Sequence, residues 1–237
     1  WDIYHFTATA GQIVWIHDLG ASPSSAFYWQ LFDSDGDNLA NDWLDGGDPG
    51  RYVLTEGGAY SIRVSTYYGN HDYVGTYGFH LAPVPVPQEF NLAIGDTVSA
   101  DQINGVGVAG AGRIESSGSW DVYRFTATAG QIVWLRDLGG SPSGRFLWQL
   151  LDSDGTYILG DWLDGSSYGR YVLTRGGDYS VRVSTYHAGW DYVGTYSFQL
   201  APVPAPQEFN LAIGDRGGDG RIGPTATPGA GNIEVPG

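Results

Sequence analysis

The stretch WDIYHFTATAGQIVW at residues 1–15 returns almost unchanged as WDVYRFTATAGQIVW at residues 120–134. The match continues without a gap to the C-terminus at a spacing of about 119 residues, and roughly two thirds of the aligned positions are identical. A period of this length corresponds to a whole domain rather than to one turn of a solenoid. The chain therefore holds two copies of one module.

Within each copy, the strongest matches form short blocks that turn residues separate, such as AGQIVW, SDG, GRYVLT and DYVGTY. In one block, Tyr60, Ile62 and Val64 alternate with Ser61 and Arg63, which is the pattern of a half-buried strand. Strands at spacings of about 8–12 residues are typical of sandwiches and barrels. The sequence therefore predicts an all-β fold of two tandem antiparallel β-sandwich modules of jelly-roll-like type.

Two Pro-rich joints divide the chain. APVPVP at residues 82–87 and APVPAP at residues 201–206 place Pro at every second position, which favours an extended, semi-rigid spacer. These joints predict a first module at residues 1–86 and a second, complete module at residues 87–205, followed by a C-terminal lead-in segment at residues 206–237.

The repeat unit does not begin and end where the chain does: Trp1 matches Trp120, inside the second unit, and residues 206–237 match the segment that precedes Trp120. GAGRIESSGS runs directly into Trp120, whereas the matching GAGNIEVPG at residues 229–237 has no module after it. In the second module, residues 87–119 precede Trp120, and we call such a segment a lead-in. The first module would then lack its own lead-in and present an open sheet edge. We expect the C-terminal segment to complete the first module of a neighbouring copy, as separate subunits or as one long tandem polypeptide; folding back onto its own chain is the other arrangement. The apolar residues of this assembly segment are Phe209, Leu211, Ile213, Ile222, Ile233 and Val235.

Composition narrows the choice of partners. The 237 residues carry a net charge of −15, with 26 acidic residues against 11 Arg and no Lys. Such a surface repels phosphate backbones and lacks the basic clusters that hold proteins on anionic membranes. No apolar run approaches the roughly 20 residues that a membrane span needs. We expect the partner to be another copy of this chain, with no nucleic acid and no membrane insertion.

Several blocks together resemble a known family. Asp2-x-Tyr4-x-Phe6 is followed by Ala10-Gly11-Gln12 and, later, by Gly75-Thr76-Tyr77, and the same blocks recur in the second copy. This combination is similar to the bacterial pre-peptidase C-terminal (PPC) domain. The resemblance implies a secreted jelly-roll β-sandwich without catalytic activity, placed outside the cell or on the bacterial surface.

The sequence offers no active site. A repeated active site should keep its acid or base in both copies, yet every His is replaced by another residue type in the other copy. The chain contains no Cys, no G-x-S-x-G elbow, no HExxH and no dinucleotide fingerprint. We therefore expect a protein that is not an enzyme and needs no cofactor.

Acidic residues cluster at two equivalent positions. Asp33 and Asp35 lie in DSDGD, and Asp152 and Asp154 lie in DSDGT. Asp followed by Gly is typical of a hairpin turn, in which Asp caps backbone N–H groups. The alternative interpretation is a calcium site, since carboxylates suit this ion, although the spacing does not fit an EF-hand loop. The turn is the favoured interpretation.

Aromatic and hydroxyl residues raise a carbohydrate alternative. The surface candidates for a polysaccharide platform or an intermodule contact are Trp43, Tyr73, Trp162, Tyr192 and Trp190. They favour, as an alternative function, an accessory polysaccharide-binding module of a secreted hydrolase or adhesin. Thr225 and Thr227 lie in PTATP, which is either an O-glycosylation site or a plain flexible loop.

The Arg residues retained in both copies form one further pattern. Arg51 and Arg63 recur as Arg170 and Arg182 while other charges change. In so acidic a chain we expect them to pair with Asp.

Overall fold

The computed structural model describes residues 1–45, 50–66, 73–165, 169–185, 192–204 and 206–231. These residues form strands, turns and bends, which confirms the predicted all-β class. Within the described ranges, the chain has no helix of the length and apolar character needed to cross a membrane.

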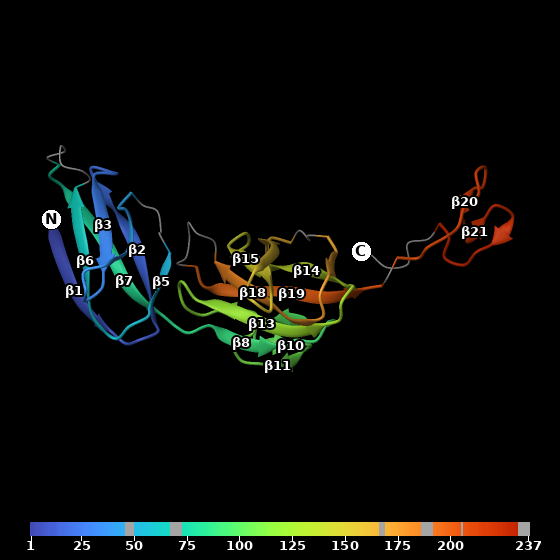
Figure 1. Ribbon diagram of the computed structural model, residues 1–237, viewed down its shortest axis with the longest axis horizontal. Helices are drawn as coiled ribbons and strands as arrows, with labels where there is room; N and C mark the ends of the chain where they lie inside the picture. Colours follow the sequence, from blue (N-terminus) through green and yellow to red (C-terminus); the bar gives the residue numbers. More distant parts are fainter. Residues whose placement is uncertain (46–49, 67–72, 166–168, 186–191, 205, 232–237) are drawn as a thin grey trace.

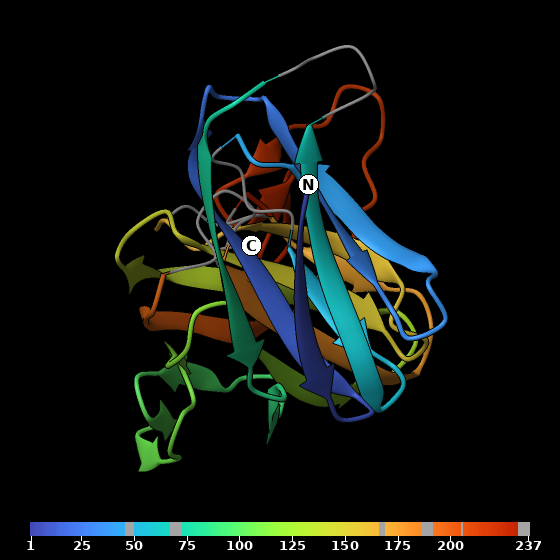
Figure 2. The ribbon, with the colours of Figure 1, turned by 90° about the vertical axis from the view of Figure 1, so that its left-hand side faces the viewer.

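The first module packs two antiparallel sheets against each other. One sheet has the order β1 (Asp2–Ala8), β6 (Gly58–Thr66), β3 (Phe27–Phe32) and β4 (Asn38–Trp43). The other has the order β5 (Arg51–Leu54), β2 (Gln12–Ser22) and β7 (Thr76–Val84). Figure 2, viewed from the end of the molecule that holds this module, shows its strands crossing in front of the second module. Its core includes Ile16, Trp29, Leu31, Tyr60, Ile62 and Val64.

The second module repeats this arrangement with the same strand order. Its first sheet contains β16 (Tyr157–Trp162), β15 (Phe146–Asp152), β18 (Gly177–Thr185) and β13 (Trp120–Ala127). Its second sheet contains β17 (Tyr171–Leu173), β14 (Gln131–Ser141) and β19 (Gly194–Val203). The alternating pattern of the sequence is confirmed in β6, where Tyr60, Ile62 and Val64 are buried and Ser61 and Arg63 are partly exposed.

Residues 87–119, the lead-in of the second module, add strands that have no counterpart beside the first module. They are β8 (Gln88–Asn91), β9 (Thr97–Ser99), β10 (Gln102–Ile103), β11 (Val106–Gly107) and β12 (Arg113–Ile114). β8 pairs with β13, and β9 and β12 pair with β19, so the lead-in covers one edge of each sheet (Figure 1). The β8–β13 pair is parallel, which departs from the wholly antiparallel prediction.

The C-terminal segment forms a small sheet of its own. It contains β20 (Gly217–Gly218), β21 (Arg221–Ile222) and β22 (Thr225–Ala226), which align in sequence with β9, β10 and β11. Figure 1 shows this sheet at the end of the molecule opposite the first module. Residues 206–231 therefore do not lie against the first module of their own chain.

Two of the retained Arg residues do not pair with Asp as expected. Arg63 donates to the Gln30 side-chain oxygen, and Arg182 donates to Gln149 in the same way. The prediction was wrong because Gln30 lies directly opposite Arg63 in the β3–β6 register, so an amide oxygen is the nearest acceptor.

Candidate functional site

A network of hydroxyl and carboxylate groups marks the same edge in both modules. In the first, the Tyr77 hydroxyl lies 2.7 Å from that of Tyr4 and donates to Asp2 Oδ2 at 2.5 Å. In the second, the equivalent Tyr196 lies 2.7 Å from Tyr123 and donates to Asp121. The residues that carry the family resemblance, the D-x-Y and the final Tyr, therefore meet at one place.

The two networks differ in what covers them. Tyr123 is fully buried, whereas Tyr4 is 43% exposed. In the second module, the Phe90 ring of β8 stacks on Tyr123 at a centroid distance of 5.0 Å, and Leu92 of the lead-in is buried in the same core. Among the described residues, β1 pairs only with β6, and β7 pairs only with β2. The edge that residues 87–119 cover in the second module is thus open in the first.

Backbone hydrogen bonds anchor the lead-in to both sheets of the second module. Each bond joins a lead-in residue to β13 or β19, which are the counterparts of β1 and β7. The bonds are Leu92 N–H to Arg124 O (2.8 Å), Gly95 N–H to Leu200 O (2.6 Å), Leu200 N–H to Asp96 O (3.0 Å) and Tyr196 N–H to Gly112 O (2.9 Å). An open sheet edge presents such groups unpaired, so the edge of the first module is a template for another strand.

Gly112 brings the lead-in into contact with the hydroxyl network. Its N–H donates to the Tyr123 hydroxyl at 2.7 Å, and its φ of 68° lies in the left-handed region. A Cβ at this position would lie 2.5 Å from the Ser99 carbonyl carbon, so a side chain does not fit. The C-terminal segment has Gly231 at the equivalent position, with φ 80° and a Cβ position 2.4 Å from Gly218 Cα.

Covering the network changes its electrostatics. Burial raises the pKa of the Asp121 carboxyl to about 7, although the hydrogen bond from Tyr196 favours its ionised form. Burial also raises the pKa of Tyr196 well above its ordinary value. The pKa of Tyr77 is raised too, by burial and by its hydrogen bonds to Asp2 and Tyr4. The second module therefore holds a carboxyl that is easier to protonate than an exposed Asp.

The C-terminal segment has the internal hydrogen bonds of a lead-in without its anchoring bonds. Gly220 N–H donates to Ala230 O at 2.7 Å, as Asp101 donates to Ala111 at 2.6 Å. The other matching bonds are Gly223 N–H to Arg216 O, Thr227 N–H to Gly220 O, Ala230 N–H to Thr227 O and Asp215 N–H to Ala212 O. Between described residues, the bonds of this segment all remain within it. It is folded like a lead-in and separate from any sheet edge.

The predicted assembly residues lie largely on the surface of this segment. Phe209 is 38% exposed, Leu211 is 61% exposed and Ile213 is fully exposed, while Ile222 is partly buried. Ile233 and Val235 lie outside the described residues. In the second module, Leu92, the counterpart of Leu211, is only 8% exposed. Leu92 is less exposed than Leu211 because Leu92 lies against the sheet edge at β13, whereas Leu211 contacts no sheet edge among the described residues.

Two of the substitutions between the C-terminal segment with its expected host and the internal pair fall at contacts that hold the internal lead-in. Val98, which is fully buried where β9 meets β19, has Gly217 as its counterpart. Arg124, which makes two hydrogen bonds to Glu89 at 3.0 and 2.6 Å, has His5 as its counterpart. A junction built from the C-terminal segment would therefore lack the Val98 side chain and the Arg124–Glu89 ion pair.

The predicted calcium residues lie in hairpin turns. Asp33 Oδ1 accepts the N–H groups of Asp35 and Asp37 at 3.1 and 2.8 Å, and Asp152 caps the equivalent turn. Over the described parts of the chain, no three His, Cys, Asp or Glu side chains gather as a metal site would require. Calcium binding by Asp33, Asp35, Asp152 and Asp154 stays a prediction.

The structure describes four of the five aromatic candidates. Trp43 packs edge-on against Tyr28 at 5.5 Å, and Tyr192 lies under the Arg145 guanidinium at 4.4 Å. Tyr73 is 44% exposed, Trp162 is half-buried, and Trp190 lies outside the described residues. Polysaccharide binding stays an alternative prediction, as does O-glycosylation at Thr225, which is exposed, and Thr227, which is partly exposed.

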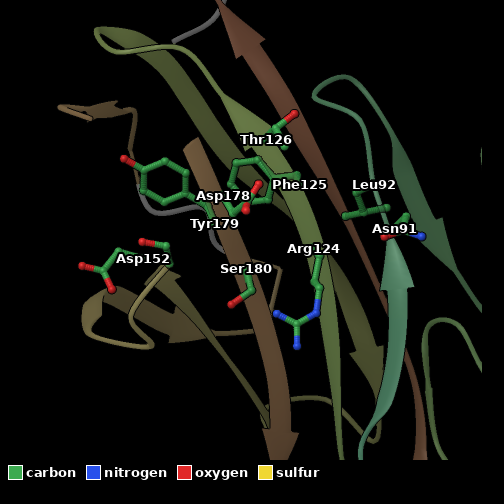
Figure 3. A pocket seen from close by; sticks show the side chains of 10 residues that line it. Asn91, Leu92, Arg124, Phe125, Thr126, Asp152, Asp178, Tyr179 and Ser180 are labelled. Carbon is green, nitrogen blue, oxygen red and sulfur yellow. The ribbon is translucent and has the colours of Figure 1, made fainter. Parts of the chain in front are cut away.

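A shallow groove lies beside the covered edge of the second module (Figure 3). Arg124 and Ser180 line it from β13 and β18, and Asp152 and Asp178 lie at its rim. Asn91 and Leu92 of the lead-in also line the groove, so it lies where the lead-in meets the first sheet of the second module.

No family model matches the chain, and no curated protein does. Among solved structures, the pre-peptidase C-terminal domain of collagenase from Bacillus anthracis has a TM-score of 0.34 and 14% identity; the match covers 48% of this chain and 96% of that one. PliG of Aeromonas hydrophila, a periplasmic inhibitor of g-type lysozyme, has a TM-score of 0.35 and 12% identity, over 50% of this chain and 100% of that one. The CUB1-EGF-CUB2 region of human MASP-1/3 has a TM-score of 0.28 and 9% identity, over 84% and 92%.

The two modules are β-sandwiches. Sequence reasoning singled out the C-terminal segment but not the hydroxyl and carboxylate network at the open edge of the first module. Asp2, Tyr4 and Tyr77 appeared only as family motif residues. Comparing the exposure of Tyr4 with that of Tyr123 shows that the network is covered in one module and open in the other, and that comparison needs coordinates.

Proposed function

We propose that this chain is a noncatalytic extracellular structural protein, a protomer that assembles head to tail by donating its C-terminal segment to the first module of the next copy. One observation carries the proposal. The edge that residues 87–119 bury in the second module is open in the first, while residues 206–231 have the internal hydrogen bonds of a lead-in without a sheet to join. A PPC-like relationship, supported by the motif residues that meet at this edge, suits a location on the bacterial surface.

The internal lead-in specifies the proposed contacts. Residues 207–210 would run parallel to β1, as β8 runs parallel to β13, with Phe209 stacked on Tyr4. The Gly231 N–H would donate to the Tyr4 hydroxyl, as Gly112 donates to Tyr123. The remaining backbone bonds would join Leu211 N–H to His5 O, Gly214 N–H to Leu81 O, Leu81 N–H to Asp215 O and Tyr77 N–H to Gly231 O.

Burial of apolar surface would drive the association. Phe209 and Leu211 are exposed, and burying a side chain of this size contributes roughly 1.5–3 kcal/mol. Strand addition would also satisfy the unpaired groups of β1 and β7. The donor already has its internal turns, so docking requires less ordering than the capture of an unfolded segment.

The test compares two variants that change charge equally. Leu211→Asp places a carboxylate where the equivalent Leu92 is buried, whereas Thr225→Asp places one where the equivalent Val106 is 66% exposed. We expect wild type and Thr225→Asp to form regular fibres in electron micrographs, and Leu211→Asp and a chain without residues 206–237 to stay monomeric. Fibres from the deletion, or the same particle size for all four chains, would refute the proposal.

A mixing experiment identifies the recipient. A chain without residues 206–237 can only accept a segment, and a chain with Tyr4→Asp can only donate one. The two together should give a one-to-one heterodimer by light scattering, while each alone stays monomeric. Polymers that persist in a denaturing gel would instead indicate one long tandem polypeptide.

A further inference from the structure

The two modules contact each other through side chains, without strand pairing. Arg51 of the first module donates to the Gly118 carbonyl oxygen at 2.6 Å, and its guanidinium lies 4.0 Å from the ring centroid of Trp120. Trp120 packs against a small apolar cluster of the first module, in which Trp15 and Val84 are almost fully buried. Burial in this joint, together with the nearby charge of Arg182, lowers the pKa of Arg51. The joint is a desolvated cation–π contact on an apolar base.

Every side chain of this joint recurs in the other copy. The counterparts of Ile13, Trp15, Arg51, Ala82 and Val84 are Ile132, Trp134, Arg170, Ala201 and Val203, all of the same residue type. The counterpart of Trp120 is Trp1. The far face of the second module therefore has the residues that hold Trp120, and the first module begins with the residue that they would hold.

Exposure is greater at the equivalent positions of the second module and at Trp1 than at the internal joint. Trp15 and Val84 are 3% and 6% exposed, whereas Trp134 and Val203 are both partly exposed. Arg170 is exposed, in contrast to the partly buried Arg51. Trp1 is 88% exposed, the largest exposed indole surface among the described residues. The same residue types are thus more exposed on the second module than at the internal joint.

We propose that Trp1 of each incoming copy seats on Trp134 and Val203 of the preceding copy, beneath the guanidinium of Arg170. This inference rests on the proposed head-to-tail assembly, since strand donation brings the two faces together. We call the contact of Trp1 with Trp134, Val203 and Arg170 the clamp. At the internal joint, the residues that hold Trp120 come before the lead-in in the chain, and Trp134, Arg170 and Val203 likewise come before the C-terminal segment. One junction can therefore contain both the donated segment and the clamp. The clamp fixes the angle between successive copies, and the structural repeat of the array becomes one module rather than one chain.

Hydroxyl-radical footprinting with mass spectrometry tests the contact. Oxidation of Trp1 is compared between wild-type fibres and monomeric Leu211→Asp, with the exposed Tyr73 as an internal reference. We expect Trp1 to be oxidised about fivefold more slowly in fibres. Equal oxidation rates in fibres and monomers would overturn the clamp and leave strand donation standing, whereas failure of the wild type to form fibres would overturn both.

Two variants measure the effect on fibre geometry. Trp1→Ala and Arg170→Ala should still polymerise, because strand donation is intact, but their fibres should have a persistence length shorter by about twofold or more in electron micrographs. Arg175→Ala removes an exposed Arg elsewhere on the same module and should give fibres like the wild type. Wild-type stiffness in both Trp1→Ala and Arg170→Ala would overturn the inference.

Discussion

The hydroxyls of Tyr4 and Tyr77 lie 2.7 Å apart, the same separation as that of Tyr123 and Tyr196 in the other module. The first pair is partly exposed to solvent, and the second is completely enclosed by the lead-in. The geometry of the site is therefore set by the sandwich itself and not by its cover. A partner strand would meet groups that already have the arrangement seen in the covered module.

Tyr123→Phe should lower the free energy of unfolding of the second module by about 1–3 kcal/mol, because the buried Gly112 N–H loses its acceptor. Tyr4→Phe, tested in the monomeric Leu211→Asp background, should change stability by less than about 0.5 kcal/mol, since Tyr4 is exposed there. Urea denaturation followed by fluorescence measures both. Equal losses in the two variants would show that the cover is irrelevant to the network.

Asp121 should make the stability of the second module depend on pH. Its folded pKa of about 7 lies above the ordinary value of 3.8, so its contribution is fully present below pH 3.8 and is lost as pH rises through 7. Asp121→Asn should remove this slope and leave the variant more stable than wild type at about pH 8, by about 2–4 kcal/mol. Denaturation at about pH 4 and pH 8 measures the difference. A variant with the wild-type slope would contradict the assignment.

His5→Arg should strengthen assembly by creating with Glu208 the ion pair that Arg124 makes with Glu89. That pair is more than half exposed, so the gain is about 0.2–1 kcal/mol, or roughly a one-and-a-half- to fivefold lower critical concentration. Sedimentation of fibres over a concentration series measures it. Adding Glu208→Gln should cancel the gain, and a gain that survives this second change would place the effect elsewhere.

Salt should promote assembly. Each copy carries a net charge of −15, so approaching copies repel, and the Debye length falls to about 10 Å at 0.1 M salt. We expect the critical concentration to decrease several-fold between about 20 and about 200 mM NaCl. A critical concentration that increases with salt would mean that ion pairs, rather than apolar burial, hold the junction.

Asp33→Ala should cost about 1 kcal/mol of stability, because Asp33 caps two backbone N–H groups of its turn. Asp33→Asn retains an acceptor oxygen and should cost less than about 0.5 kcal/mol. Calcium should leave the melting temperature of the wild type unchanged, as expected of a turn. A rise in melting temperature with calcium that Asp33→Asn abolishes would instead support a metal site.

The repeat made much of the fold predictable from sequence. Alternation in residues 60–64 identified a strand whose inward face is confirmed, and the period separated the two modules. Pairing between distant strands could not be predicted in the same way, because register depends on contacts across the sheet. The parallel β8–β13 pair and the hydrogen bond from Arg63 to Gln30 both follow from such registers.

The candidate site was predictable on one side only. Phe209 and Leu211 stand out because they repeat Phe90 and Leu92 of the second module. The tyrosine network has no comparable signal, since Tyr4 and Tyr123 have the same residue type whether covered or open. The joint of Arg51 with Trp120 was missed for the same reason: retained residues do not reveal that their neighbours belong to another module.

The short connection between modules determines how the molecule would respond to pulling. β7 ends at Val84 and β8 begins at Gln88, so a tensile load on the chain passes from a strand of one sandwich into a strand of the next through residues 85–87. Both strands are hydrogen-bonded along their length to neighbours, β2 and β13. In the proposed fibre, a tensile load would therefore act on hydrogen-bonded strands on both sides of residues 85–87.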